Sequence, residues 1–275
     1  MNFWQAILLG IIQGVTEFLP VSSSGHLVLA QYALGFEEPQ LLFDVAVHFA
    51  TLFAVAIFFF PILTRLRFKQ WLMIAVGTVP AVFIGLFFRD AIEGFFASEV
   101  IVSLALLVTA GLNFFADSKL SKEAGQARQI DQSEQTKQTD QKQILENIQD
   151  LTWIQAIVVG SFQALAVIPG ISRSGSTLAG GLSQKLDRQT AFTFSFLLSL
   201  PVIAGATLLQ VLDVVETGSL SISIPVLVVG GLAAFFSGYA SLWIFKKILT
   251  TARLELFGWY CLVLGLASLA FYFST

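Results

Sequence analysis

Charged residues are scarce in this chain. Asp, Glu, Lys and Arg make up 12% of its 275 residues, whereas an ordinary soluble domain has about a quarter. So few charges cannot cover a globular surface, which excludes a soluble enzyme. Cys261 is the single cysteine, so neither a disulfide framework nor a cysteine-rich metal site is expected. The basic residues are not clustered as on a nucleic-acid-binding surface, so we expect no nucleic-acid partner.

Apolar residues are abundant instead: they make up 56% of the chain, including 27 Phe. This content excludes disorder. A membrane span needs about 20 mostly apolar residues, and this predicts an all-α integral membrane protein with six full spans. The predicted spans are 42–60, 70–88, 100–116, 189–212, 217–245 and 256–273. The first Lys or Arg is Arg65, so we expect no cleaved signal peptide.

Two further apolar segments, 3–36 and 151–184, are interrupted by the Pro/Ser/Gly clusters 20–25 and 169–175. Each half of such a segment has only about 15 residues, which is marginal for crossing the bilayer core. We expect each segment to form a re-entrant helical hairpin. Its non-helical tip must then be buried in protein or line a wet cavity.

Residues 117–150 are polar, with 12 of the chain's Asp, Glu, Lys and Arg and eight Gln. They predict a cytoplasmic linker between a first repeat, 1–116, and a second repeat, 151–275. A shift of 150 residues aligns the repeats with eight identities between positions 3 and 25, among them Gly10 with Gly160. A shift of 153 aligns Gly77 with Gly230.

Each half is therefore expected to be one hairpin followed by three spans. Because three is odd, the second half enters the membrane from the opposite side. The result is an inverted repeat whose functional centre lies near the midplane, where the halves meet.

Lys and Arg in short loops predict the orientation. With the 61–69 loop inside, 13 of the 15 basic residues are cytoplasmic and only Arg89 falls outside, while Arg173 lies within a hairpin. Both termini are then extracytoplasmic, and the first hairpin enters from outside.

Five ionisable residues lie in apolar surroundings: Glu17, His26, Asp44, His48 and Arg173. A charge at mid-bilayer costs at least about 2.5–3.5 kcal/mol, so such residues need partners and mark functional sites by default.

The two tips have the composition of an anion site, because serine hydroxyls and backbone N–H groups at helix starts bind phosphate. The guanidinium of Arg173 adds a bidentate clamp. The predicted phosphate-binding residues are Ser22, Ser24, Gly25, Ser172, Arg173, Ser174 and Gly175. The alternative is that the tips are small-residue turns that let helices pack closely.

Gln13 and Glu17 are spaced i, i+4 and share a helix face. Their oxygens suit a hard divalent cation, Mg²⁺ or Ca²⁺, completed by phosphate oxygens and water. The alternative is a structural salt bridge between Glu17 and Arg173. Asp44 and His48 have the same spacing; they could line the cavity, bind a second cation or stabilise a helix start.

The stretches 13–26 (QGVTEFLPVSSSGH) and 169–177 (PGISRSGST) resemble the two signatures of the undecaprenyl-diphosphate phosphatases of the bacitracin-resistance type. The resemblance implies hydrolysis of a polyprenyl diphosphate lipid, undecaprenyl diphosphate, to the monophosphate and phosphate in the bacterial cell (inner) membrane. That reaction recycles the lipid carrier for peptidoglycan. The resemblance also implies that Glu17, Ser23, His26 and Arg173 are catalytic. Gln13 stands where the family motif also allows Glu.

Three alternatives stay open beside this resemblance. Ser23 or a water molecule could be the nucleophile, with His26 as its base, and the chain could form a homodimer. A polyprenyl-phosphate transporter or flippase could use the same cavity, since broken helices and inverted repeats are also transporter architecture. Phosphatidic-acid-type lipid phosphatases are excluded, because no His follows His48 and no Arg-Pro pair occurs.

Overall fold

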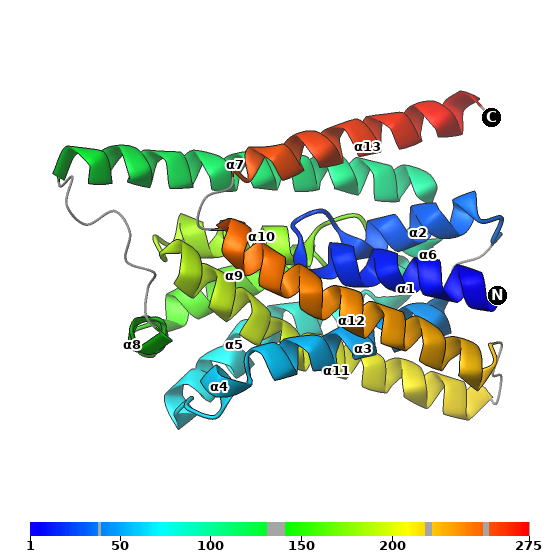
Figure 1. Cartoon of the computed structure of the whole chain (residues 1–275), viewed down its shortest axis with the longest axis horizontal. Helices are drawn as coiled ribbons and strands as arrows, with labels where there is room; N and C mark the ends of the chain where they lie inside the picture. Colours follow the sequence, from blue (N-terminus) through cyan, green and yellow to red (C-terminus); the bar gives the residue numbers. More distant parts are fainter. Residues whose placement is uncertain (38–39, 131–140, 218–221, 250–252, 275) are drawn as a thin grey trace.

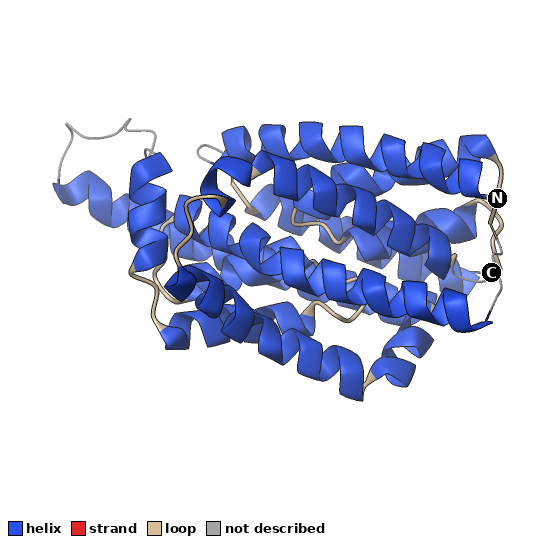
Figure 2. Cartoon of the chain, turned by 90° about the horizontal axis from the view of Figure 1, so that it is seen from below, coloured by secondary structure: helices blue, strands red, loops and turns tan. Residues whose placement is uncertain are grey.

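The computed structural model describes residues 1–37, 40–130, 141–217, 222–249 and 253–274, and within these ranges it contains helices and no strand (Figures 1 and 2). The helices are α1 (Phe3–Phe18), α2 (Ser23–Ala33), α3 (Leu41–Phe58), α4 (Phe60–Leu63), α5 (Phe68–Phe87), α6 (Arg89–Phe96), α7 (Glu99–Ile130), α8 (Gln141–Gln149), α9 (Trp153–Leu165), α10 (Arg173–Ser183), α11 (Arg188–Thr217), α12 (Ile224–Leu249) and α13 (Glu255–Ser274).

Six of the described helices are long and apolar enough to cross a membrane, one for each predicted span: α3, α5, α7, α11, α12 and α13. Their outer faces carry exposed apolar side chains such as Phe87, Phe236 and Phe271. A soluble protein rarely exposes such a continuous apolar surface. The chain is therefore a multi-pass membrane protein.

The span expected at 217–245 starts later than its hydropathy suggests. Helix α11 continues to Thr217, and α12 begins at Ile224. Pro225 is the second residue of α12, a position where proline is well tolerated because its missing N–H has no helical partner there.

The segment 117–150, expected to be only a polar linker, is helical at both ends. Helix α7 extends from the span expected at 100–116 as far as Ile130, and α8 covers Gln141–Gln149. Ile144 and Ile148 of α8 are buried in the largest apolar cluster among the described residues. Lys69 Nζ also donates to the Gln149 carbonyl at 2.8 Å, so α8 lies against the start of α5. Residues 131–140 lie outside the described ranges.

Both interrupted segments form a pair of short helices. Helices α1 and α2 are separated at residues 19–22, and α9 and α10 at residues 166–172. Each pair packs against the other half of the chain: α1 lies on α12, and α9 lies on α5. Each crossing joins one glycine from each aligned pair. A Cβ on Gly10 would collide with the Gly230 carbonyl, and a Cβ on Gly160 would collide with the Gly77 carbonyl. The close backbone approach explains these identities.

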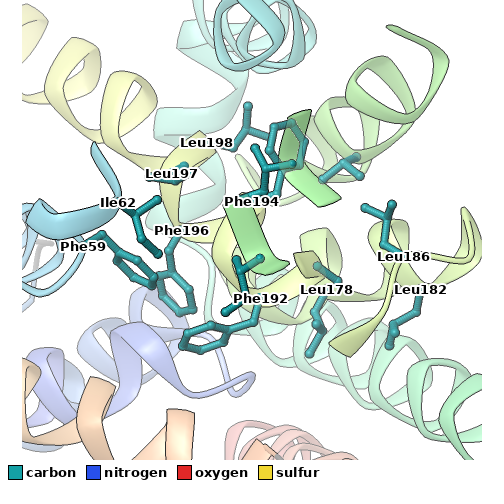
Figure 3. Close-up of a cluster of buried hydrophobic side chains, with 14 of the residues drawn as sticks. Phe59, Ile62, Leu178, Leu182, Leu186, Phe192, Phe194, Phe196, Leu197 and Leu198 are labelled. Atoms are coloured by element: carbon teal, nitrogen blue, oxygen red, sulfur yellow. The ribbon is translucent and has the colours of Figure 1, made fainter. Parts of the chain in front are cut away.

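An aromatic cluster forms the core beside the hairpins (Figure 3). Phe59, Phe192 and Phe196 are buried and in mutual ring contact, with centroids 4.6–5.9 Å apart. Phe18, at the end of α1, joins this cluster through Phe196 at 5.7 Å. The cluster thus anchors the first tip to α11.

Different segments of the chain lie at the two ends of the helix bundle. Both termini lie at one end, whereas α4 and α8 lie at the other (Figure 1). Helices α7 and α13 run side by side along the bundle. The basic loop at 61–69 and the segment around α8 are therefore on the same side, as the predicted orientation requires. The opposite membrane orientation of the two halves stays a prediction.

Candidate active site

Glu17 is the centre of a buried polar cluster. It lies in the last turn of α1, and its side chain is 5% exposed. Its Oε1 accepts from Arg173 Nη2 at 2.6 Å, and its Oε2 accepts from Ser23 Oγ at 2.6 Å. The tertiary structure thus unites three of the four predicted catalytic residues, although Arg173 comes from the other half of the chain.

The Ser23 hydroxyl is aimed by the backbone of the residue before it. Ser22 has φ 70° and ψ 93°, a left-handed conformation that costs a non-glycine residue about 1–3 kcal/mol. The equivalent residue of the second tip, Ser172, has an ordinary φ of −69°. The strain is therefore confined to the tip that carries Ser23.

Arg173 begins α10 and reaches across to the first hairpin. Its guanidinium lies over the Phe196 ring, 5.1 Å from the centroid, and this contact fixes the plane of the fork. Nη2 binds Glu17, whereas Nη1 is buried and has no hydrogen-bond partner. A buried guanidinium nitrogen without an acceptor is costly, and it is the group that an anionic ligand would satisfy.

Gln13 and His48 complete the surroundings of Glu17. Gln13 Nε2 donates to Glu17 Oε2 at 3.0 Å, and His48 Nε2 lies 3.6 Å from the same oxygen. The ring of His48 is oriented by a 2.7 Å contact from Nδ1 to the Asp44 carbonyl, which can only accept. Asp44 itself points elsewhere and accepts from Gln31 Nε2 at 2.6 Å.

A divalent cation would have to share Glu17 with these partners. Within the described ranges, no group of three or more His, Cys, Asp and Glu side chains could hold a metal ion. A carboxylate offers about four acceptor positions, and Gln13, Ser23 and Arg173 take three of them. Gln13 Oε1 is buried without a partner, so one amide oxygen and one carboxylate position remain. This donor set fits a cation that takes its other ligands from phosphate and water.

His26 is not joined to Ser23. Its Nδ1 lies 2.7 Å from the Ser22 carbonyl, and its Nε2 lies 2.7 Å from the hydroxyl of Tyr260 on α13. Since a carbonyl only accepts, Nδ1 carries the hydrogen, and in the neutral ring Nε2 accepts from Tyr260. The two rings are also stacked, with centroids 5.5 Å apart.

The other predicted phosphate-binding residues form matching turns. Ser22 Oγ accepts from Gly25 N at 3.3 Å, and Ser172 Oγ accepts from Gly175 N at 3.1 Å. The next hydroxyls complete the turns: Ser24 Oγ lies 3.3 Å from Ser22 Oγ, and Ser174 Oγ lies 3.2 Å from Ser172 Oγ. The two glycine N–H groups thus donate to the serines that cap their own helices, and their binding of phosphate stays a prediction.

Three residues at the site were not anticipated from the sequence. Thr109 and Asn113 of α7 bind the backbones of the tips, and Tyr260 binds His26. The signal for the first two was present, because they are polar residues one helical turn apart within an apolar span. Tyr260 gave no such signal, since tyrosine is common in membrane helices.

These observations define a class: an integral membrane protein in which a serine, a carboxylate and an arginine meet between two broken helices, at a site suited to an anion. Comparison with known proteins adds the family. The family described as bacitracin resistance protein BacA matches residues 6–267, and the chain belongs to this family.

Relatives cover the chain from end to end. Undecaprenyl-diphosphatase 4 of a Bacillus cereus strain is 39% identical over 278 residues, which span 100% of this chain and 99% of the relative. The undecaprenyl-diphosphatase of Carboxydothermus hydrogenoformans is 38% identical over 98% of this chain and 97% of the relative. That of Halothermothrix orenii is 38% identical over 97% of this chain and 96% of the relative.

Proposed function

We propose that this chain is an undecaprenyl-diphosphatase, a membrane-embedded hydrolase that converts undecaprenyl diphosphate and water to undecaprenyl phosphate and inorganic phosphate. The full-length similarity to relatives of that name supports the substrate. The observation that carries the chemistry is the shared carboxylate, where Ser23 Oγ donates to one oxygen of Glu17 and Arg173 binds the other.

Arg173 and the tips bind the diphosphate in this proposal. The free Nη1 of Arg173 takes a phosphate oxygen, and the fork neutralises charge on the group being transferred. Such positioning and charge stabilisation carry most of the catalysis in phosphoryl transfer. Ser172 and Ser174 flank the fork, and the Ser174 hydroxyl, which donates to the Leu19 carbonyl, would have to leave that carbonyl to donate to a phosphate.

Ser23 is the nucleophile, and Glu17 takes its proton. Ser23 Oγ attacks the terminal phosphorus, the bond to the bridging oxygen breaks, and undecaprenyl phosphate leaves with that oxygen. The 2.6 Å contact places Glu17 Oε2 where the hydroxyl proton must go. Water then attacks the phosphorus of the phosphoserine. As the bond to Ser23 Oγ breaks, Glu17 returns its proton to that oxygen, and phosphate leaves with the hydroxyl and the remaining hydrogen of the water.

His26 is the second acid–base group of the proposal. Its Nδ1–H holds the carbonyl of the strained Ser22, so it positions Ser23 from the first turn of α2. To exchange a proton with the substrate or water, its Nε2 must release Tyr260.

A divalent cation, Mg²⁺ or Ca²⁺, belongs to the proposal. Gln13 Oε1 and Glu17 would hold it. When bound, it neutralises phosphate charge. In the structure, Arg173 and Ser23 orient the Glu17 carboxylate.

The decisive experiment is phosphate release from a C55 lipid diphosphate by the purified protein, with the lipid product identified by mass. Release of one phosphate per lipid supports hydrolysis. Absence of release, together with movement of intact lipid between leaflets, would support the transporter alternative. The relatives' names give that alternative no support.

Acid-quenched protein, digested after turnover, tests the nucleophile. Phosphate on the peptide that contains Ser23 is expected. Turnover without any phosphopeptide, even when hydrolysis of the intermediate is slowed, would favour a water nucleophile.

We further propose that the site opens to the extracytoplasmic side of a bacterial cell membrane. The basic residues support this sidedness, because they place the 61–69 loop in the cytoplasm. Single cysteines in a Cys261→Ser background test it on intact cells with an impermeant thiol reagent. Cysteines replacing the exposed Ser223 and Ser274 should label, and one replacing the exposed Thr64 should not. The reverse pattern would place the site's opening in the cytoplasm.

A further inference from the structure

Helix α7 carries two buried polar side chains one turn apart, Thr109 and Asn113. Their exposed fractions are 0% and 1%. A polar side chain inside a membrane protein is costly unless it is paired. Thr109 and the Nδ2 of Asn113 are paired with the backbones of the hairpin tips, whereas Asn113 Oδ1 is buried without a hydrogen-bond partner. The two residues belong to neither hairpin.

Thr109 holds the turn that precedes Arg173. Its hydroxyl donates to the Gly170 carbonyl at 2.8 Å and accepts from Ser172 N at 2.9 Å. Gly170 has φ +96°, and a Cβ there would lie 2.7 Å from the Ala105 side chain on α7. The second tip therefore rests directly on α7, and one side chain satisfies both a donor and an acceptor of the turn.

Asn113 holds the first tip at the same level. Its Nδ2 donates to the Pro20 carbonyl at 2.6 Å, two residues before Ser22. Its Oδ1 faces the second tip, 3.3 Å from where a Cβ on Gly175 would lie. One helical turn of α7 thus contacts the backbones of both tips.

The reacting groups come from different hairpins, so their separation depends on how the tips are held. Direct links between the tips include the 2.6 Å Arg173–Glu17 ion pair, which a substrate phosphate must compete with, and the Ser174 Oγ to Leu19 carbonyl bond at 2.9 Å. The bonds from α7 do not involve the groups that bind the phosphate. Phosphate binding at Arg173 therefore does not require these bonds to break.

We propose that Thr109 and Asn113 are positioning residues, which hold the turn before Arg173 and the turn before Ser23 on α7 and so set the distance between guanidinium and nucleophile. This proposal rests on the proposed phosphatase function. A misplacement of about 1 Å can cost about 100-fold in rate, so the loss of one such anchor should be visible in turnover.

Thr109→Val tests the proposal, because valine keeps the shape and removes both hydrogen bonds. We expect kcat/KM for the C55 lipid diphosphate to fall about tenfold or more. Thr109→Ser keeps the hydroxyl and should stay near wild type. Thr78→Val is the matched control, since buried Thr78 donates only to the Ile74 carbonyl in its own helix. It should lose little activity.

A double-mutant cycle separates positioning from general stability. In an Arg173→Lys background, Thr109→Val should reduce kcat/KM much less. The lysine ammonium lacks the forked guanidinium geometry that Thr109 is proposed to position. Equal losses in both backgrounds, or equal losses for Thr109→Val and Thr78→Val, would overturn the proposal.

Hydrogen exchange gives a readout that does not depend on catalysis. Thr109→Val should speed exchange of the Ser172 amide, and Thr78→Val should not. Asn113→Leu should reduce kcat/KM while leaving exchange at Ser172 near wild type. Unchanged exchange in Thr109→Val would refute the anchor even if activity fell. If the wild-type protein released no phosphate, the proposed phosphatase function would be refuted. The exchange rate of the Ser172 amide would still test whether Thr109 holds the second tip.

Discussion

The Glu17–Arg173 ion pair offers the sharpest test of the site, because stability and activity should respond differently to the same substitutions. Nη2 and Oε1 are 2.6 Å apart, and the two side chains are 14% and 5% exposed. Arg173→Met removes the cation and leaves Glu17 buried without its charge partner. Glu17→Gln leaves the guanidinium of Arg173 buried without its charge partner. The double variant, with both substitutions, contains no charge of the pair.

Burial sets the size of the effect. Removing one partner of a buried pair costs about 3–5 kcal/mol, whereas replacing both by uncharged residues is often close to neutral. At about 2–4 °C per kcal/mol for a chain of this size, each single variant should unfold about 6–20 °C below wild type. The double variant should recover most of that loss. Arg173→Lys keeps the charge and should unfold within a few degrees of wild type.

Activity should follow a different order. Removing one donor that stabilises transition-state charge costs about 10²–10³-fold in kcat. Arg173→Lys should therefore lose at least about 10²-fold while staying folded, and the stable double variant should be inactive. The assays are the unfolding midpoint in detergent and the rate of phosphate release. Arg253→Met is the surface control: its pair with Glu255 is 3.3 Å long, with side chains 78% and 37% exposed. That change should cost at most about 1 kcal/mol.

Two results would refute this reasoning. A double variant as unstable as the worse single variant would show that the pair is not a coupled unit. Near wild-type turnover in Arg173→Lys would show that charge alone is needed at this position, and that the forked geometry and the free Nη1 play no part.

Three further predictions concern the nucleophile, the cation and the packing. Ser23→Ala should reduce phosphate release by about 10³-fold or more at an unchanged unfolding midpoint, because it removes the attacking oxygen; retention of a tenth of the activity would favour water. Gln13→Glu adds a carboxylate beside Glu17 and should lower the Mg²⁺ concentration that half-restores activity after chelation, by about tenfold for 1.4 kcal/mol of added binding; an unchanged midpoint would separate Gln13 from the cation. Gly160→Ala should destabilise by about 1–3 kcal/mol or more, since its Cβ would collide with the Gly77 carbonyl. Gly111→Ala, with open space at its Cβ, should be neutral or stabilising in the same melt.

The sequence by itself determined the features that depend on local composition. Membrane spans can be predicted from the sequence because every residue in lipid must be apolar or paired. The six predicted spans agree with six helices of the structure apart from their ends. The break in the first hairpin can be read from the sequence because Pro20 disrupts a continuing helix and the serines after it favour a helix start, where Ser22 caps α2. Glu17 and Arg173 could be singled out because an ionisable residue in an apolar run is too costly to be accidental.

The tertiary structure decided which of these groups meet. Sequence spacing favoured His26 as the partner of Ser23, but the strained backbone of Ser22 turns Ser23 toward Glu17 and leaves His26 with Tyr260. The spacing could not show this, because the direction of a side chain at a helix start depends on the backbone torsions before it and on its own rotamer. Likewise, Ile144 and Ile148 lie in a stretch whose polarity hides their burial.

Contacts between distant segments were also beyond the sequence. The repeat pointed to Gly10 and Gly160 as related positions, but not to the glycines that each one touches in the opposite half. Local sequence patterns reflect the free-energy cost of placing a residue in lipid, and this cost depends on the chemistry of that residue itself. Pairing depends on which surfaces of two helices come together, and Asn113 reveals its role only when both tips lie against it.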